Sequence, residues 1–117
     1  MFSDDQRVAE WLQDIIENCD RVAGYLAGMT FERFQRETLV QDAVERCIER
    51  VTEASIRIGR ERLEKIVPEV PLHEVRGLGN LLRHNYDRVN LLNIWETATD
   101  DLPPLRIACL AAVGRQD

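Results

Sequence analysis

Residues 38–59 read TLVQDAVERCIERVTEASIRIG, and their apolar side chains recur at alternating spacings of four and three residues. Such spacing places the side chains on one face of an α-helix, because a helix makes one turn in about 3.6 residues. The apolar positions are Val40, Val44, Cys47, Val51, Ala54 and Ile58 in this stretch, and Val8, Leu12, Ile15, Cys19, Val22 and Leu26 in an earlier one. Two long amphipathic helices that pack in antiparallel orientation are therefore expected, the first over about residues 4–27.

Residues that begin or end helices divide the segment between and after these two stripes. Thr30 is expected to cap a short helix or turn in TFERF. Thr38 and Gln41 fit the S/T-x-x-E/Q capping box, in which each side chain binds a free backbone amide. Gly59 is expected to end or bend the second long helix.

Prolines mark the remaining boundaries. Pro68 and Pro71 are expected to stop one helix and to start the next, which should cover about residues 71–86. Asn90 is a plausible cap for LLNIWETAT, and DLPP at residues 101–104 is expected to open a last helix that reaches about residue 113.

Length and composition are those of one globular domain. The chain has 117 residues, of which 44% are hydrophobic and 31% charged. Only 6% are aromatic, which suits helices better than a sheet. We therefore expect a single all-α domain over residues 1–117, folded as an antiparallel bundle of four to five helices. No apolar run approaches the roughly 18 residues of a membrane span and the start has no signal-peptide pattern, so a cytoplasmic protein is expected.

The cysteines and histidines show no pattern of a metal site. Cys19, Cys47 and Cys109 are widely separated and lie in apolar helical patterns, so buried, reduced thiols are expected. His73 and His84 have no cysteine near them at zinc-binding spacing. We expect no metal and no cofactor.

The net charge of −6 opposes non-specific binding of nucleic acid, so an RNA substrate would need a locally basic cleft. Two segments could supply one. The first, IRIGRERLEK, contains Arg57, Arg60, Arg62 and Lys65, and the second contains Arg76, Arg83 and Arg88 around His84. The rest of the chain is more acidic and could equally face a basic partner protein.

A helical wheel of residues 75–87 separates a polar face from an apolar one. Val75, Leu78 and Leu82 form the apolar face with Tyr86 at its edge, and the polar face has Arg76, Asn80, Arg83, His84 and Asp87. An ordinary solvated face is one interpretation. The functional alternative is favoured by composition, because the face places an imidazole, which titrates near neutral pH, between guanidinium groups.

Gly77 and Gly79 lie inside this expected helix, where each costs about 1 kcal/mol relative to alanine. Close approach of another backbone would compensate for that cost. The neighbour could be a second helix of the bundle, the same helix of another subunit, or a nucleic acid, and we favour helix packing.

Three segments of the chain carry a family resemblance: DRVAGYLAGMTFERFQRE, then QDAVERCIERVTEASIRIG, then RGLGNLLRHNYDRVNLLNIWETATDDLP. In this order they resemble HepT-like toxins of the HEPN class almost from end to end. The most specific part is NLLRHNY, which matches the motif R-N-x-x-x-H-x-Y of that family at Asn80, His84 and Tyr86. Gly79 stands where the motif has its arginine. Arg83 and Arg76 are reasonable replacements, because a guanidinium can bind phosphate with two hydrogen bonds.

The resemblance implies a HEPN-like bundle that forms a homodimer, with the motif helices of both subunits at a shared cleft. It also implies a metal-independent ribonuclease, acting on RNA such as tRNA or mRNA, that is the toxin of a type VII-like toxin-antitoxin pair. His84 would be the general base, Arg83 or Arg76 would stabilise the phosphorane, and Asn80 would hold the phosphate or the imidazole. The implied partner is a nucleotidyltransferase antitoxin that binds the toxin or adds AMP to Tyr86.

A second hypothesis follows from Gly79. If the missing arginine marks a degenerate site, the protein is a dimeric binding or regulatory module without catalytic activity. The acidic net charge fits this alternative, because a protein surface does not require the positive field that RNA requires.

Overall fold

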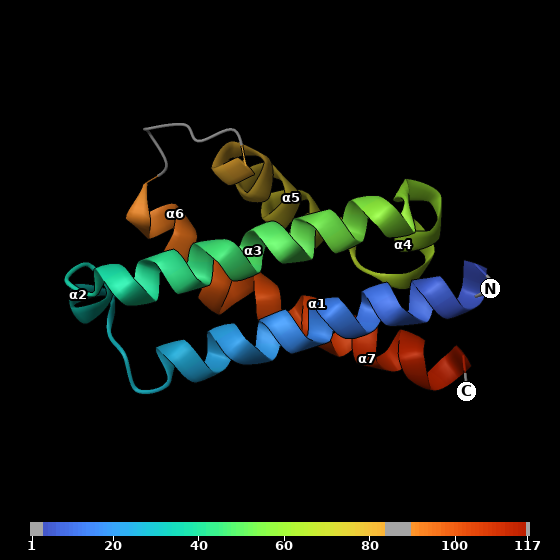
Figure 1. The fold of residues 1–117 in the computed structure, drawn as a ribbon, viewed down its shortest axis with the longest axis horizontal. Coiled ribbons are helices and arrows are strands. Elements are labelled where there is room, and N and C mark those ends of the chain that lie inside the picture. The colour runs from blue at the N-terminus through green and yellow to red at the C-terminus, as the bar shows by residue number, and fades with distance from the viewer. Residues whose placement is uncertain (1–3, 84–89, 117) are drawn as a thin grey trace.

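The computed structural model describes residues 4–83 and 90–116, and almost all of this part of the chain is helical. Its two longest helices, α1 (Asp4–Leu26) and α3 (Thr38–Ile58), lie side by side and run in opposite directions (Figure 1). The apolar stripe of each helix faces the core: Leu12, Ile15, Val44 and Val51 are completely buried. The expected pair of antiparallel helices is confirmed.

Two further helices complete the bundle. α5 (Glu69–Arg83) packs on α3, and α7 (Leu102–Gln116) packs on α1. Both ends of the chain lie at one end of the bundle, near the short α4 (Arg60–Ile66), and α2 (Phe31–Phe34) lies at the other (Figure 1). The expected all-α antiparallel bundle is thus confirmed, and in the described residues no helix is both long and apolar enough to cross a membrane.

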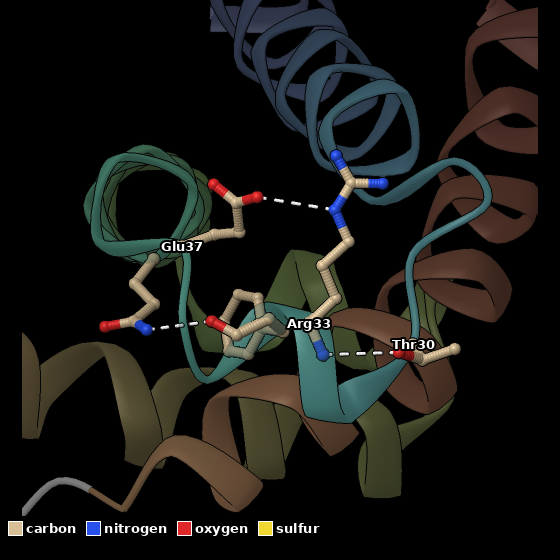
Figure 2. Close-up of polar contacts among 5 residues, drawn as sticks. Thr30, Arg33 and Glu37 are labelled. Carbon is tan, nitrogen blue, oxygen red and sulfur yellow. Dashed lines mark hydrogen bonds and ion pairs between the residues drawn. The ribbon is translucent and has the colours of Figure 1, made fainter.

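The turn from α1 to α3 is stabilised by polar contacts around α2 (Figure 2). Thr30 caps α2 as expected, since its hydroxyl oxygen accepts a hydrogen bond of 3.2 Å from the amide of Arg33. The guanidinium of Arg33 also pairs with the carboxylate of Glu37, Nε to Oε1 3.3 Å, just before α3 begins. The aromatic ring of Trp95, from α6 (Leu91–Glu96), packs against Phe31 and Phe34 and fixes α2 to the bundle.

The prediction of a capping box at Thr38 and Gln41 is wrong. Glu37 is the N-cap of α3, because its carbonyl accepts the first helical hydrogen bond from the Gln41 amide, and no side chain caps this end. The side-chain amide of Gln41 donates to the carbonyl of Phe34 at 2.8 Å. The reason is local: the Phe34 carbonyl, which also accepts from the Glu37 amide at 3.2 Å, takes the side-chain amide of Gln41 as a second donor, so this side chain does not bind the N-cap amide.

The turns after α3 follow the glycine and proline signals. Gly59, at φ +93°, separates α3 from α4 as expected. Pro68 precedes α5, and Pro71 is the third residue of that helix, where its missing N–H would have no partner. α5 begins two residues before the expected position, and its expected continuation from 84 to 86 lies outside the described residues.

The C-terminal part differs from the prediction of two separate helices. The Asn90 side chain caps α6 as expected, accepting from the Leu92 amide at 2.7 Å. α6 then continues without a break through a π-helical turn, η1 (Thr97–Asp101), into α7. Pro103 and Pro104 follow that turn, and neither has a backbone N–H to donate a hydrogen bond within the helix. A π-helical turn is a common way to accommodate such an interruption.

Candidate functional site

One polar face of α5 points away from the core. Glu69, His73, Arg76, Asn80 and Arg83 follow one another at spacings of four and three residues, so they form a single stripe along the helix. The opposite face buries Leu72, Val75, Leu78 and Gly79. The structure therefore brings together Arg76, Asn80 and Arg83 of the predicted site, whereas His84 and Tyr86 lie outside the described residues, as do Asp87 and Arg88.

A hollow of about 310 Å³ lies between α4 and this face of α5. Arg76 and Asn80 line it from α5, and Arg60 and Glu64 line it from α4. Arg60 belongs to the first basic segment of the sequence and Arg76 to the second. The fold thus brings one arginine from each segment to the same hollow.

The two arginines differ in how they are held. Arg60 pairs with Glu64 at 3.2 Å between Nε and Oε1, with both side chains exposed to solvent. Arg76 makes no hydrogen bond or ion pair within residues 4–83 and 90–116, although it is half-buried. An unpaired guanidinium at the wall of a hollow is a favourable contact for an anion such as a phosphate.

A second hollow, of about 300 Å³, lies on the other flank of α5 against α6 and η1. Its charged side chains are acidic: Glu74, Glu96 and Asp101. Burial raises the pKa of Asp101, and the charges of Glu74, Asp100 and Glu96 raise it further. The flank of α5 toward η1 therefore carries only acidic charges, whereas the flank toward α4 carries Arg60 and Arg76 together with Glu64 and Glu69.

His73 is a residue of this site that the sequence analysis missed. It lines both hollows, so it stands on the ridge between the arginine side and the acidic side of α5. The signal was available, because His73 lies three residues before Arg76 and seven before Asn80 on the same helical face.

Gly79 packs directly against α3. A Cβ built at this position would lie 2.6 Å from Cβ of Thr52 and would also overlap the Thr52 hydroxyl. That hydroxyl donates to the carbonyl of Val75, one turn before Gly79, at 3.3 Å. Helix packing is thus the reason for this glycine, and a side chain here would point into α3 and away from the hollow.

The same explanation does not apply to Gly77. Apart from its chain neighbours and the backbone of its own helix, no described atom lies within 4 Å of the position that its Cβ would occupy, and Gly77 lines both hollows. Packing against another helix of the described chain is therefore wrong for Gly77, and a neighbour from another subunit or a nucleic acid stays a prediction.

A larger hollow, of about 390 Å³, lies between α1 and α3. Its walls mix both signs of charge, with Arg21, Arg50 and Arg57 opposed by Asp14, Glu17 and Glu53. Arg57 is already paired with Glu53 at 2.9 Å. Neither volume nor charge selects between the two hollows, since the α4–α5 hollow also has two arginines and two glutamates. We assign the functional site to α5 because Asn80 of the motif lies on that helix and lines its hollow.

The cysteines have no place in this chemistry. All three are free and buried, as expected. Burial raises the pKa of the Cys19 and Cys109 thiols to about 12, so neither forms the reactive thiolate near neutral pH. In the described ranges, no three His, Cys, Asp or Glu side chains gather as a group that could hold a metal ion.

Comparison with known proteins gives a consistent set of relatives. The family described as Ribonuclease HepT-like matches residues 15–112 of the chain. A protein named "Putative RNase MJ1216" from Methanocaldococcus jannaschii is 32% identical over 99 residues, which cover 85% of this chain and 81% of that protein. A protein named "Probable ribonuclease HepT" from Thermococcus cleftensis is 30% identical over 97 residues, 83% of this chain and 87% of that protein. No solved structure matches the chain.

Proposed function

The chain belongs to the HepT-like ribonuclease family, and on this premise we propose that it is a metal-independent endoribonuclease, the toxin of a type VII-like toxin-antitoxin pair that acts in the cytoplasm. One observation carries the proposal. Arg76, unpaired within the described residues, and Asn80 line the same hollow on the exposed face of α5, and the motif residue His84 follows four residues after Asn80.

The proposed reaction uses the ribose of the RNA as the nucleophile. His84 takes the proton from a 2′-OH, and the 2′ oxygen then attacks the adjacent phosphorus. The bond from phosphorus to the 5′ oxygen of the next nucleotide breaks, and that oxygen receives the proton that His84 has taken, directly or through water. The products are a 2′,3′-cyclic phosphate and a 5′-OH, so no oxidant, reductant or second substrate is needed.

The charge that builds up on the phosphorane oxygens requires a cation. Position 79, where the motif has arginine, is occupied by the contact between α5 and α3. Arg76 or Arg83 would therefore stabilise this charge, and Asn80 would hold the phosphate or the imidazole. Both arginines lie on the exposed face of α5.

His84→Ala tests the proposed mechanism. General-base catalysis contributes about 10²- to 10⁴-fold, so this variant should lose most RNA cleavage while its circular dichroism spectrum and melting temperature stay unchanged. Growth arrest on expression should disappear as well. The assay uses tRNA and mRNA with EDTA present. Intact RNA after incubation with wild type, together with unchanged toxicity of His84→Ala, would show that this mechanism is wrong.

The second candidate is a degenerate, dimeric binding or regulatory module. The contact of Gly79 with Thr52 favours it, because the position of the motif arginine is closed by a neighbouring helix. Gly79→Arg does not test this alternative cleanly, since the new side chain would force α3 and α5 apart. Binding of RNA or of a partner protein by wild type without any new 5′-OH ends in the RNA would support the module.

The proposed partners are a second copy of the chain and a nucleotidyltransferase antitoxin. The homodimer would place both motif helices at a shared cleft, and sedimentation velocity would show it as a species of twice the 13.5 kDa chain mass. The antitoxin would bind the toxin or add AMP to Tyr86. RNA phosphates would then compete with the added AMP for the same arginines.

A further inference from the structure

We propose that the RNA backbone runs along the hollow between α4 and α5, and that His73 and Arg60 bind it as substrate-binding residues. This inference rests on the proposed ribonuclease function and extends it, because neither residue belongs to the motif. We call His73, Arg76, Asn80 and Arg60 the α4–α5 track.

α5 supplies one wall of the track. His73, Arg76 and Asn80 follow at spacings of three and four residues, and Arg83 continues the same stripe. From His73 to Arg83 the helix rises by about 15 Å, at about 1.5 Å per residue. An imidazole, two guanidinium groups and an amide along this length offer hydrogen-bond donors to successive parts of a nucleic-acid strand.

Gly77 leaves the helix surface open between these side chains. Apart from its chain neighbours and the backbone of its own helix, no described atom lies within 4 Å of the position of its missing Cβ. A strand can therefore approach the backbone of α5 between Arg76 and Asn80, which a larger side chain would prevent.

α4 supplies the opposite wall through Arg60, its first residue. The ion pair of Arg60 with Glu64 does not prevent a role in binding, because Arg60 is 80% exposed and Glu64 is 54% exposed. Exposed pairs of this kind contribute only about 0–1 kcal/mol, so a phosphate can recruit the guanidinium at little cost.

The charges on the other flank of α5 decide on which side the strand lies. Glu74, Glu96 and Asp101 line that flank and would repel phosphates. His73 stands at the border of the two flanks. At the far end of the hollow Glu69 opposes a further phosphate, so the track should end near His73.

RNA binding by a variant that does not cleave RNA tests the track. The probe is a fluorescent single-stranded RNA that wild type cuts. We would add increasing amounts of His84→Ala protein to this RNA and measure its fluorescence anisotropy at several salt concentrations. Adding Arg60→Gln should weaken binding several-fold and reduce the slope of log K against log salt by about 0.7, the value for one phosphate contact in a single strand. Arg60→Lys should keep the slope near that of the parent.

Arg57→Gln is the matched control. Arg57 also pairs with a glutamate four residues away and is exposed, but it lines the hollow between α1 and α3. Arg57→Gln changes the net charge by the same amount as Arg60→Gln, but because Arg57 lies outside the track, the variant should leave binding and the salt slope nearly unchanged. Equal effects of the two variants would mean that only net charge matters, and would overturn the track.

His73→Gln is tested in protein with His84 intact. This substitution should raise KM several-fold with little change in kcat, because it removes a contact to the substrate and His73 takes no part in the chemical step. A lower kcat with unchanged KM, or the same KM as wild type, would contradict the inference. Melting temperatures of all variants check that the fold is intact.

The failure of the track and the failure of the proposed function give different results. If wild type cuts RNA and both Arg60→Gln and His73→Gln match it, the track is wrong and the ribonuclease stands. If wild type neither cuts nor binds RNA, both proposals are wrong.

Discussion

Gly77 and Gly79 lie two residues apart in α5, yet they have opposite surroundings. Gly79 is pressed against Thr52 of α3, whereas Gly77 faces two hollows with no described atom close to it. The sequence pattern is the same for both, since each is a glycine inside an expected helix. The difference comes from Thr52, a residue of another helix that no local pattern connects with α5.

Alanine substitutions should separate the two glycines. Gly79→Ala places a methyl group 2.6 Å from Cβ of Thr52 and should lower the free energy of unfolding by about 1–3 kcal/mol, the usual cost of overpacking. Gly77→Ala should raise the free energy of unfolding by up to about 1 kcal/mol, because alanine is the better helix former and the space is free. Urea unfolding followed by circular dichroism measures both. Equal changes for the two variants would contradict the packing in α5.

The candidate site was predicted in part at this scale. Arg76, Asn80 and Arg83 share one exposed face as the helical wheel indicated. His73 was missed because the wheel began at residue 75, and Arg60 could not be assigned to the site because it comes from another helix. A single sequence shows which residues share a helical face, but it does not show which other helix lies opposite that face.

At the scale of helices, burial is easier to predict than helix ends. α1 and α3 were predictable because many apolar positions repeat the same signal, and burial of the whole stripe determines the outcome. The start of α3 at Thr38 was predicted, but its capping box was not formed, because the Gln41 side chain binds the carbonyl of Phe34 instead. The π turn before α7 escaped prediction because prolines can either end a helix or be accommodated within a continuing one.

Asp101, in that π turn, should make stability depend on pH. Its pKa is raised in the folded protein, first by burial and then by Glu74, Asp100 and Glu96, so folding favours the protonated carboxyl. Its contribution to stability is therefore fully present below the unfolded pKa of about 3.9 and is lost as the pH rises through the higher folded pKa. At neutral pH the ionised carboxylate opposes folding.

Asp101→Asn should consequently be more stable than wild type at pH 7, and the difference should shrink toward zero near pH 3. Thermal melts at a series of pH values measure this. Glu74→Gln should stabilise wild type more than it stabilises the Asp101→Asn variant, because that variant lacks the Asp101 carboxylate that Glu74 repels. A stability difference that is the same at every pH would contradict this account.

At the scale of the whole molecule, the net charge of −6 is not spread evenly. The flank of α5 toward α4 has Arg60 and Arg76 beside Glu64 and Glu69, whereas the flank toward η1 has only the acidic Glu74, Glu96 and Asp101. The sequence predicts that an RNA site needs a basic cleft and indicates two segments that could form it. Where the two segments meet depends on the turns between helices: Gly59, at φ +93°, ends α3, and Arg60 directly after it lines the hollow that Arg76 also lines.

The same arginines give the proposed antitoxin a way to switch off the proposed ribonuclease. Tyr86 follows His84 by two residues and Arg83 by three in the sequence. AMP on Tyr86 would add a negatively charged phosphodiester and an adenine within three residues of Arg83 and His84, which are proposed to act on the substrate. Its phosphate should pair with Arg83, which is exposed at the end of α5, and so compete with RNA for that guanidinium.

Intact-mass spectrometry after co-expression with a nucleotidyltransferase and ATP tests this switch. Wild type should gain one or more AMP units and lose toxicity, whereas Tyr86→Phe should gain none and should be neutralised only if the antitoxin also binds tightly. Tyr25→Phe is the matched control, because Tyr25 is the other tyrosine of the chain and lies on exposed surface of α1, and it should be modified like wild type. AMP on the Tyr86→Phe protein would place the modification elsewhere. Modified wild type that still binds RNA with unchanged affinity would show that competition for Arg83 is not how the switch works.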